Sequence, residues 1–76
     1  MTDRLPRITA AEAIKALESA GFLLARQSGS HKIYKNADGR RVTVPYHAGK
    51  TLHPKLLKSI LRDANLTVDE FRKLLE

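Results

Sequence analysis

The chain has 76 residues, a formal net charge of +6 and no cysteine, so we expect a single domain, residues 1–76, with no disulfide and no thiolate metal site. Its three histidines show no familiar ligand spacing, and neither a signal peptide nor the ~18-residue apolar run of a membrane span is visible, so we predict a cytoplasmic protein without metal or cofactor. The excess of positive charge favours a polyanionic partner: nucleic acid first, then an acidic protein, then an anionic membrane surface.

The first predicted element is a helix that follows a loose arm, Met1 to Arg7. Thr9 and Glu12 have the Thr-x-x-Glu spacing of a capping box. Gly21 suits the left-handed position that ends a helix, and Phe22 beyond it can pack on Leu17. One apolar face recurs at helical spacing and consists of Ala10, Ala13, Ile14, Leu17 and Ala20.

Three strand-like runs follow, over residues 22–27, 31–35 and 40–44. Ser28-Gly29-Ser30 is a tight connection, and Asn36-Ala37-Asp38-Gly39 is a strong turn signal that Gly39 closes. Two successive hairpins predict a three-stranded antiparallel meander, which Pro45 ends.

Strand alternation separates Ile33 from Lys32 and Tyr34 on the second strand. We expect the Ile33 face to be the one that packs on the helices. Val42 and Val44 share a face of the third strand.

A loop with His47 and Lys50 leads to a second helix that begins near Pro54, a residue suited to the first helical position. Its buried stripe is predicted to contain Leu57, Ile60, Leu61 and Ala64. Asn65 is a plausible stop. Thr67 and Glu70 form a second capping box for a short final helix, whose apolar side contains Val68, Phe71, Leu74 and Leu75.

The element order predicts an α+β fold: an α-β-β-β-α two-layer sandwich, with two helices on one face of the sheet and a short extra C-terminal helix. Double-stranded-RNA-binding domains share this arrangement. Element order alone does not assign a function.

His31 follows a Gly-Ser pair at the start of the second strand, among basic residues. An imidazole titrates near neutral pH, so it can remove the proton of a ribose 2′-hydroxyl or protonate a leaving 5′-oxygen. Backbone N–H groups around Gly29 and Ser30 can form a concavity for an anion. Because His31 shares the Ile33 face, a half-buried packing role also remains open.

The other candidates also have two interpretations each. His53 is expected to face solvent at the entry of the second helix, and His47 has a structural or an RNA-contacting role, with the structural one favoured. The stripe of Lys55, Lys58 and Arg62 is either a solvated helix face or a set of phosphate contacts. The only aromatic residues placed to stack on bases are Tyr34 and Tyr46, whereas Phe22 and Phe71 are expected in the core.

The chain from about Ala11 to Leu75 resembles the HicA family of toxin–antitoxin ribonucleases. The resemblance is carried by Gly21-Phe22, Gly29-Ser30-His31, Val44-Pro45-Tyr46-His47 and the stretch LKSILRDANL. It implies an mRNA-cleaving toxin that blocks translation, with a double-stranded-RNA-binding-like fold and its catalytic histidine at His31. It also implies a HicB-like antitoxin that masks the active site. Lys55 departs from the glycine that family members often carry before the second helix.

We therefore expect a metal-independent mRNA endoribonuclease, monomeric when free, with His31 as general base or acid and with Gly29 and Ser30 shaping its turn. The second proton-transfer group stays open between water, His47, a lysine and a tyrosine. A non-catalytic RNA-binding module of the same fold is the main rival, and a structural partner of an acidic subunit is a more distant one. The residues expected to bind RNA are Arg26, Lys32, Lys35, Arg40, Arg41 and Lys50.

Overall fold

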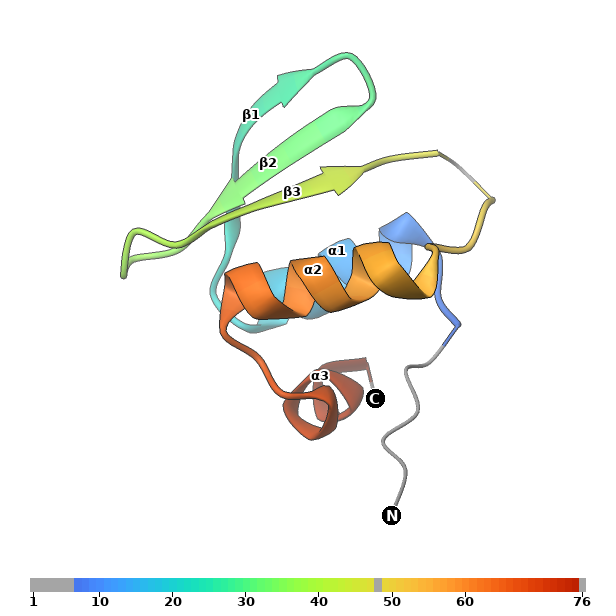
Figure 1. Ribbon diagram of the computed structural model, residues 1–76. Helices are drawn as coiled ribbons and strands as arrows, with labels where there is room; N and C mark the ends of the chain where they lie inside the picture. The colour runs from blue at the N-terminus through green and yellow to red at the C-terminus, as the bar shows by residue number, and fades with distance from the viewer. Residues whose placement is uncertain (1–6, 48, 76) are drawn as a thin grey trace.

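The computed structural model describes residues 7–47 and 49–75, so all of the predicted N-terminal arm except Arg7 lies outside the described residues. The sheet lies over α1 and α2, and α3 lies on the far side of these two helices (Figure 1). The predicted α+β sandwich with an extra C-terminal helix is confirmed. The elements are α1 Ala10–Ser19, β1 Leu23–Ser28, β2 His31–Lys35, β3 Arg41–Pro45, α2 Pro54–Ala64 and α3 Val68–Leu75.

The ends of α1 follow the local chemistry that its sequence predicts. The Thr9 hydroxyl accepts from the Glu12 backbone N–H, and the Glu12 carboxylate accepts from the Thr9 N–H, which completes the capping box. At the other end, Gly21 has φ +97°. The N–H of Phe22 donates to the carbonyl of Leu17 at 2.9 Å, as in a Schellman stop.

The predicted starts of the two C-terminal helices and the predicted end of α2 are also confirmed. Pro54 opens α2, and Asn65 ends it in the left-handed conformation with φ 59°. Thr67 and Glu70 form the capping box of α3, and Phe71 is fully buried against the core. The buried residues of α2 are the four predicted ones: Leu57, Ile60, Leu61 and Ala64.

The sheet is an antiparallel meander in the order β1-β2-β3. Tyr34 lies opposite Val42, both residues are buried, and they belong to the inner face that packs on the helices. The expectation that Ile33 faces the helices is therefore wrong. Tyr34, only 3% exposed, is not available to stack on bases.

A β-bulge in β1 changes which residues of that strand face the helices. Leu24 pairs with Tyr34 and Arg26 pairs with Ile33, so Ala25 is an extra residue in β1. Without it, alternation would place Arg26 on the inner face. The bulge instead brings Arg26 to the opposite side of the sheet.

Burial of Tyr34 has a consequence for stability at high pH. Burial raises the pKa of the Tyr34 phenol above its ordinary 10.0, and the Glu18 carboxylate raises this pKa further. As pH rises, the unfolded chain therefore loses the phenol proton before the folded chain does. The stability that the neutral, buried phenol contributes is fully present below about pH 10 and falls as pH rises towards the pKa of the folded state.

We expect a Tyr34→Phe variant to lose less stability than the wild type between pH 9 and pH 11. Urea unfolding followed by circular dichroism at several pH values measures this difference. Equal losses in the two proteins would contradict it.

Candidate catalytic face

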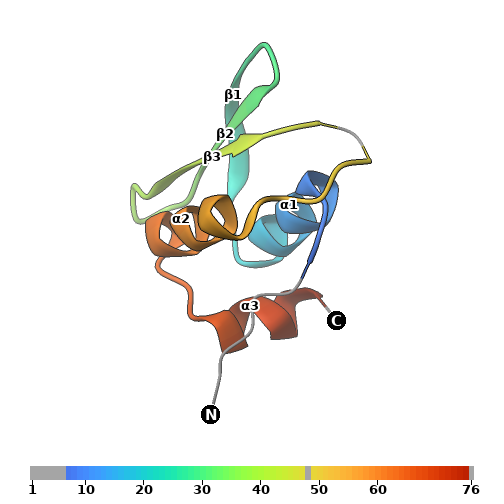
Figure 2. The same ribbon diagram turned by 45° about the vertical axis from the view of Figure 1, so that its right-hand side comes forward.

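One face of the sheet is left uncovered by the described elements, because α1, α2 and α3 all lie on the other side (Figures 1 and 2). We call this the outer face. Its central strand presents His31, Ile33 and Lys35. Residues directly opposite one another in an antiparallel pair point to the same side of a sheet, so the neighbours from the other strands are Leu23, Arg26 and Ser28 from β1 and Arg41, Thr43 and Pro45 from β3.

His31 lies at the open end of this face as the first residue of β2, and it is exposed. Its strand neighbours are Ser28 and Pro45. Within the described chain its imidazole has no hydrogen-bond partner, so both ring nitrogens are accessible. The half-buried packing role is therefore wrong, since His31 shares a face with Ile33 but that face is the one turned away from the helices.

The turn before His31 is held from both sides. Gly29 has φ +58°, in the left-handed region that glycine enters at no steric cost. The Gln27 side-chain amide donates to the Gly29 carbonyl at 3.2 Å, and the Tyr46 backbone N–H donates to the Ser30 carbonyl at 2.6 Å. These contacts fix the start of β2 at His31 and thereby hold the imidazole ring at the end of the sheet.

Pro45 fits its place opposite His31 because of the hydrogen-bond pattern of the β2–β3 ladder. The Tyr46 N–H donates to the Ser30 carbonyl, so Ser30 and Tyr46 form a hydrogen-bonded pair. Hydrogen-bonded and non-hydrogen-bonded pairs alternate along an antiparallel ladder, so the next pair, His31 and Pro45, is a non-hydrogen-bonded one. No backbone N–H is needed from the residue at this position, so proline, which has none, is tolerated there. Side chains also approach most closely in such pairs.

The predicted RNA-binding residues fall into separate groups. Arg26, Lys35 and Arg41 share the outer face with His31. Arg26 is the nearest of these cations, because it pairs with Ile33 and is diagonal to His31, whereas Lys35 is four residues along the strand, about 13 Å away. Arg40 is exposed beside the β2–β3 turn, at the opposite end of the sheet from His31.

Lys32 points to the other side of the sheet from His31, although it is adjacent in sequence. Its ammonium lies 4.3 Å from the centroid of the Tyr46 ring, a cation–π contact. Tyr46 is half-buried against the core. The structure thus gives Lys32 a role in holding the segment after β3 near the hairpin.

Lys50 lies in the loop after β3, where it lines a pocket of about 110 Å³ together with His47, His53 and Pro45. The loop is held by the Leu52 N–H, which donates to the Ile8 carbonyl at 2.8 Å. Sequence spacing did not predict that the two histidines would meet in one pocket. Because Pro45 lies directly opposite His31, this pocket adjoins the end of the sheet where His31 lies.

His53 already has a structural task in that pocket. It is the N-cap of α2, and its Nδ1 accepts the Lys55 backbone N–H at 3.1 Å. Nδ1 is therefore occupied by this hydrogen bond. His53 is exposed, as predicted for a residue that faces solvent at the start of the second helix. His47 is exposed and has no such bond within the described residues.

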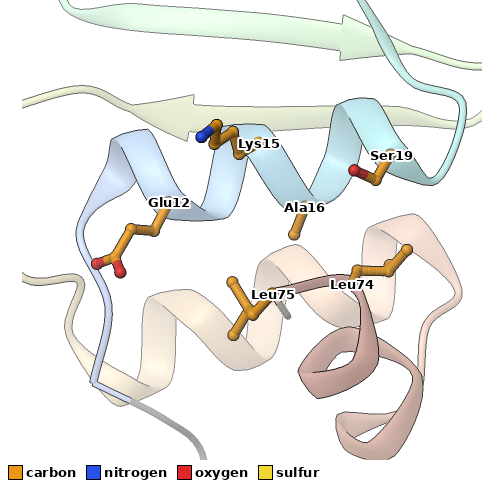
Figure 3. A pocket seen from close by; sticks show the side chains of 6 residues that line it. All are labelled: Glu12, Lys15, Ala16, Ser19, Leu74 and Leu75. Carbon is orange, nitrogen blue, oxygen red and sulfur yellow. The ribbon is translucent and has the colours of Figure 1, made fainter.

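Two further grooves lie away from the outer face. Lys55, Lys58, Ser59 and Arg62 line a shallow groove of about 480 Å³ on α2, so the predicted basic stripe is exposed. A groove of about 380 Å³ lies between α1 and the end of α3, where Leu74 and Leu75 lie below Ala16 and Ser19 (Figure 3). This second groove is separated from the sheet by α1.

Comparison with known protein families matches residues 10–66 to the family described as "HicA toxin of bacterial toxin-antitoxin". The chain belongs to the HicA toxin family. The matched HicA region contains α1, the whole sheet and α2, and therefore Gly29, Ser30 and His31, but it ends before α3. No curated protein matches the chain.

As a HicA toxin the chain is a component of a toxin–antitoxin system, and the family implies a cognate antitoxin as its partner. In the described part of the chain, no helix has the length and apolar character needed to cross a membrane.

Proposed function

We propose that this HicA toxin is a metal-independent endoribonuclease that cleaves mRNA on the outer face of its sheet and thereby blocks translation. It acts in the cytoplasm as a monomer until a HicB-like antitoxin masks the face. The observation that carries the proposal is the position of His31, which is exposed on an uncovered face that also presents three cations.

The chemistry follows from the groups on this face. His31 removes the proton of a ribose 2′-hydroxyl, and the 2′-oxygen attacks the adjacent phosphorus. The bond to the 5′-oxygen breaks, and a proton passes to that oxygen, which leaves a 2′,3′-cyclic phosphate and a 5′-hydroxyl. Arg26, the cation nearest to His31 on the face, stabilises the negative charge that develops on the phosphate.

Lys35 and Arg41 are assigned to a different part of the substrate. They lie about 13 Å from His31 along the strands, so they are too distant to contact the same phosphate. We assign them to phosphates further along the RNA chain, where they fix its position without taking part in the reaction. His47 and Lys50 beside Pro45 are the candidates for donating a proton to the leaving oxygen.

The test is incubation of the purified toxin with a defined mRNA in EDTA, followed by mapping of the cleaved ends. We expect 2′,3′-cyclic phosphate and 5′-hydroxyl ends. RNA that is bound in a salt-dependent way without being cut would support the rival interpretation, a non-catalytic RNA-binding module.

The bulge in β1 places Arg26 on the same face as His31, and a matched pair of variants tests whether this placement matters for cleavage. Arg26→Ala should lower the cleavage rate about 10–100-fold, because a preorganised charge at the reacting phosphate is removed. Arg40→Ala removes the same charge from the far end of the sheet and should change the rate less than threefold. Both rates are measured under single-turnover conditions at saturating toxin. Equal effects of the two variants would contradict the proposed place of the reaction.

A further inference from the structure

The pocket between the end of β3 and the start of α2 combines an apolar floor with a polar rim. Its volume is about 110 Å³. Ala10 and Leu52, which are buried, and Leu56, which is half-buried, supply the apolar part together with Pro45. The polar part consists of exposed residues: His47, Lys50, Thr51 and His53. A few polar groups around an apolar floor are typical of a binding site for a small organic group.

The size and the place of this pocket indicate which group fits it. Pockets for drug-sized ligands measure about 300–1,000 Å³, so one of about 110 Å³ suits a single ring system. Pro45 lines the pocket and lies directly opposite His31, at the Cα separation of about 4.5 Å that is usual for such a pair. Single-stranded RNA is recognised through bases that turn out of the stack. A nucleobase close to the reacting phosphate is therefore the group that the pocket can receive.

The rim of the pocket is held in place before any ligand binds. The Lys50 N–H donates to the His47 carbonyl at 3.2 Å. The next residue, Thr51, forms an antiparallel β-bridge with Thr9 ahead of α1. A rim that is fixed in advance loses little conformational entropy on binding, which favours selection between similar ligands.

The hydrogen-bonding groups of the rim are chiefly donors. The Lys50 ammonium has only donors. The Nδ1 of His53 accepts the Lys55 backbone N–H, so in the neutral ring the proton resides on Nε2, which is then a donor. No acidic side chain is among the described residues that line the pocket. The rim therefore complements a base edge that carries acceptors.

We propose that this pocket selects a base with a carbonyl acceptor, guanine or uracil, next to the cleaved phosphodiester, and that Lys50 is its specificity-determining residue. Guanine presents its O6 and N7 atoms and uracil its O4 atom, whereas adenine and cytosine place an amino donor on the same edge. An amino group facing Lys50 leaves both donors unpaired. The place next to the cleaved bond rests on the proposed function, and the assignment of Lys50 leaves His47 as the candidate for donating the proton.

The first test measures binding without cleavage. The His31→Ala toxin is titrated into fluorescein-labelled pentamers of cytidine whose middle nucleotide is guanosine, inosine, uridine, adenosine or cytidine, and the dissociation constant is read from anisotropy. Inosine has the carbonyl of guanosine in place of the amino group of adenosine. We expect the guanosine and inosine pentamers, the uridine pentamer, or both to bind about fivefold or more tightly than the adenosine and cytidine ones.

The pattern identifies the base and decides the proposal. Tight binding of the guanosine and inosine pentamers alone assigns the pocket to guanine, and tight binding of the uridine pentamer alone assigns it to uracil. Equal binding of all five pentamers, or preference for adenosine or cytidine, would overturn the proposal.

The second test compares two lysines in the same His31→Ala background. Lys50→Ala should reduce the preference among the pentamers to about twofold or less. Lys55→Ala removes the same charge from a lysine that lines the separate groove on α2, so the preference should persist. Thermal unfolding by circular dichroism checks that both variants are folded. Equal weakening of all pentamers by Lys50→Ala, with the preference retained, would make Lys50 a phosphate contact and overturn its assignment.

Mapping of the cleavage sites of the wild type on a defined mRNA separates the pocket from the nuclease activity. We expect guanosine or uridine to recur at one fixed position beside the cut. If the wild type cleaves no RNA but the pentamers are still discriminated through Lys50, the base pocket stands and the nuclease proposal fails. Cleavage that shows no base preference beside the cut, together with equal binding of the pentamers, would leave the nuclease standing and refute the pocket.

Discussion

Replacement of His31 by alanine should lower the rate of mRNA cleavage in EDTA by about 10²–10⁴-fold, the usual contribution of a positioned acid or base. Binding of RNA should change little, because the cations of the outer face remain. Stability should also change little, since the side chain is exposed and makes no hydrogen bond within the described residues. The measurements are the single-turnover cleavage rate, the RNA dissociation constant and the urea midpoint of the same preparation.

His53→Asn is the control for this variant. It removes another exposed imidazole but supplies a side chain that can still cap α2, so cleavage should persist. His47→Ala tests the second proton-transfer group, because His47 lies in the pocket next to Pro45. Undiminished cleavage by the His31 variant would refute the assignment of His31, whatever the other two variants do.

Replacement of Phe71 by alanine should remove most of the stability of the domain. Phe71 is 0% exposed and belongs to the core cluster that includes Leu17 and Leu57. Truncation of a buried phenylalanine costs about 3–5 kcal/mol. The total free energy of unfolding of a chain this small is roughly 5 kcal/mol or somewhat more, so a large part of the population should unfold near 37 °C.

Leu74→Ala provides the comparison for Phe71→Ala. Leu74 is half-buried in the same helix and should cost about 1 kcal/mol. Urea unfolding of the two variants gives both values. Similar small losses would show that α3 is peripheral, whereas the expected difference would show that a helix beyond the matched residues 10–66 is an integral part of this domain.

The features that the sequence by itself determined are those set by neighbouring residues. Both capping boxes, the stop at Gly21 and Phe22, the stop at Asn65 and the turn closed by Gly39 are all present as predicted. Each depends on contacts between residues one to five positions apart. Such contacts form in nearly the same way whatever the rest of the chain does.

The orientation of β2 shows where the strand pattern alone was insufficient. Ile33 and Tyr34 are both apolar enough to face a core, so alternation within the strand does not choose between them. A usable signal lay in the next hairpin: a ladder closed by Asn36 and Arg40 places Tyr34 opposite Val42. The paired valines of β3 then identify the inner face, which leaves His31 on the outer one.

Other features were decided only by the tertiary structure. The extra residue at Ala25 carries no clear sequence signal, yet it decides that Arg26 shares a face with His31. The meeting of His47, Lys50 and His53 depends on how the loop returns to Ile8. These arrangements join residues that are distant in sequence, and they form because packing of the whole sheet on the helices makes them the best way to bury the core.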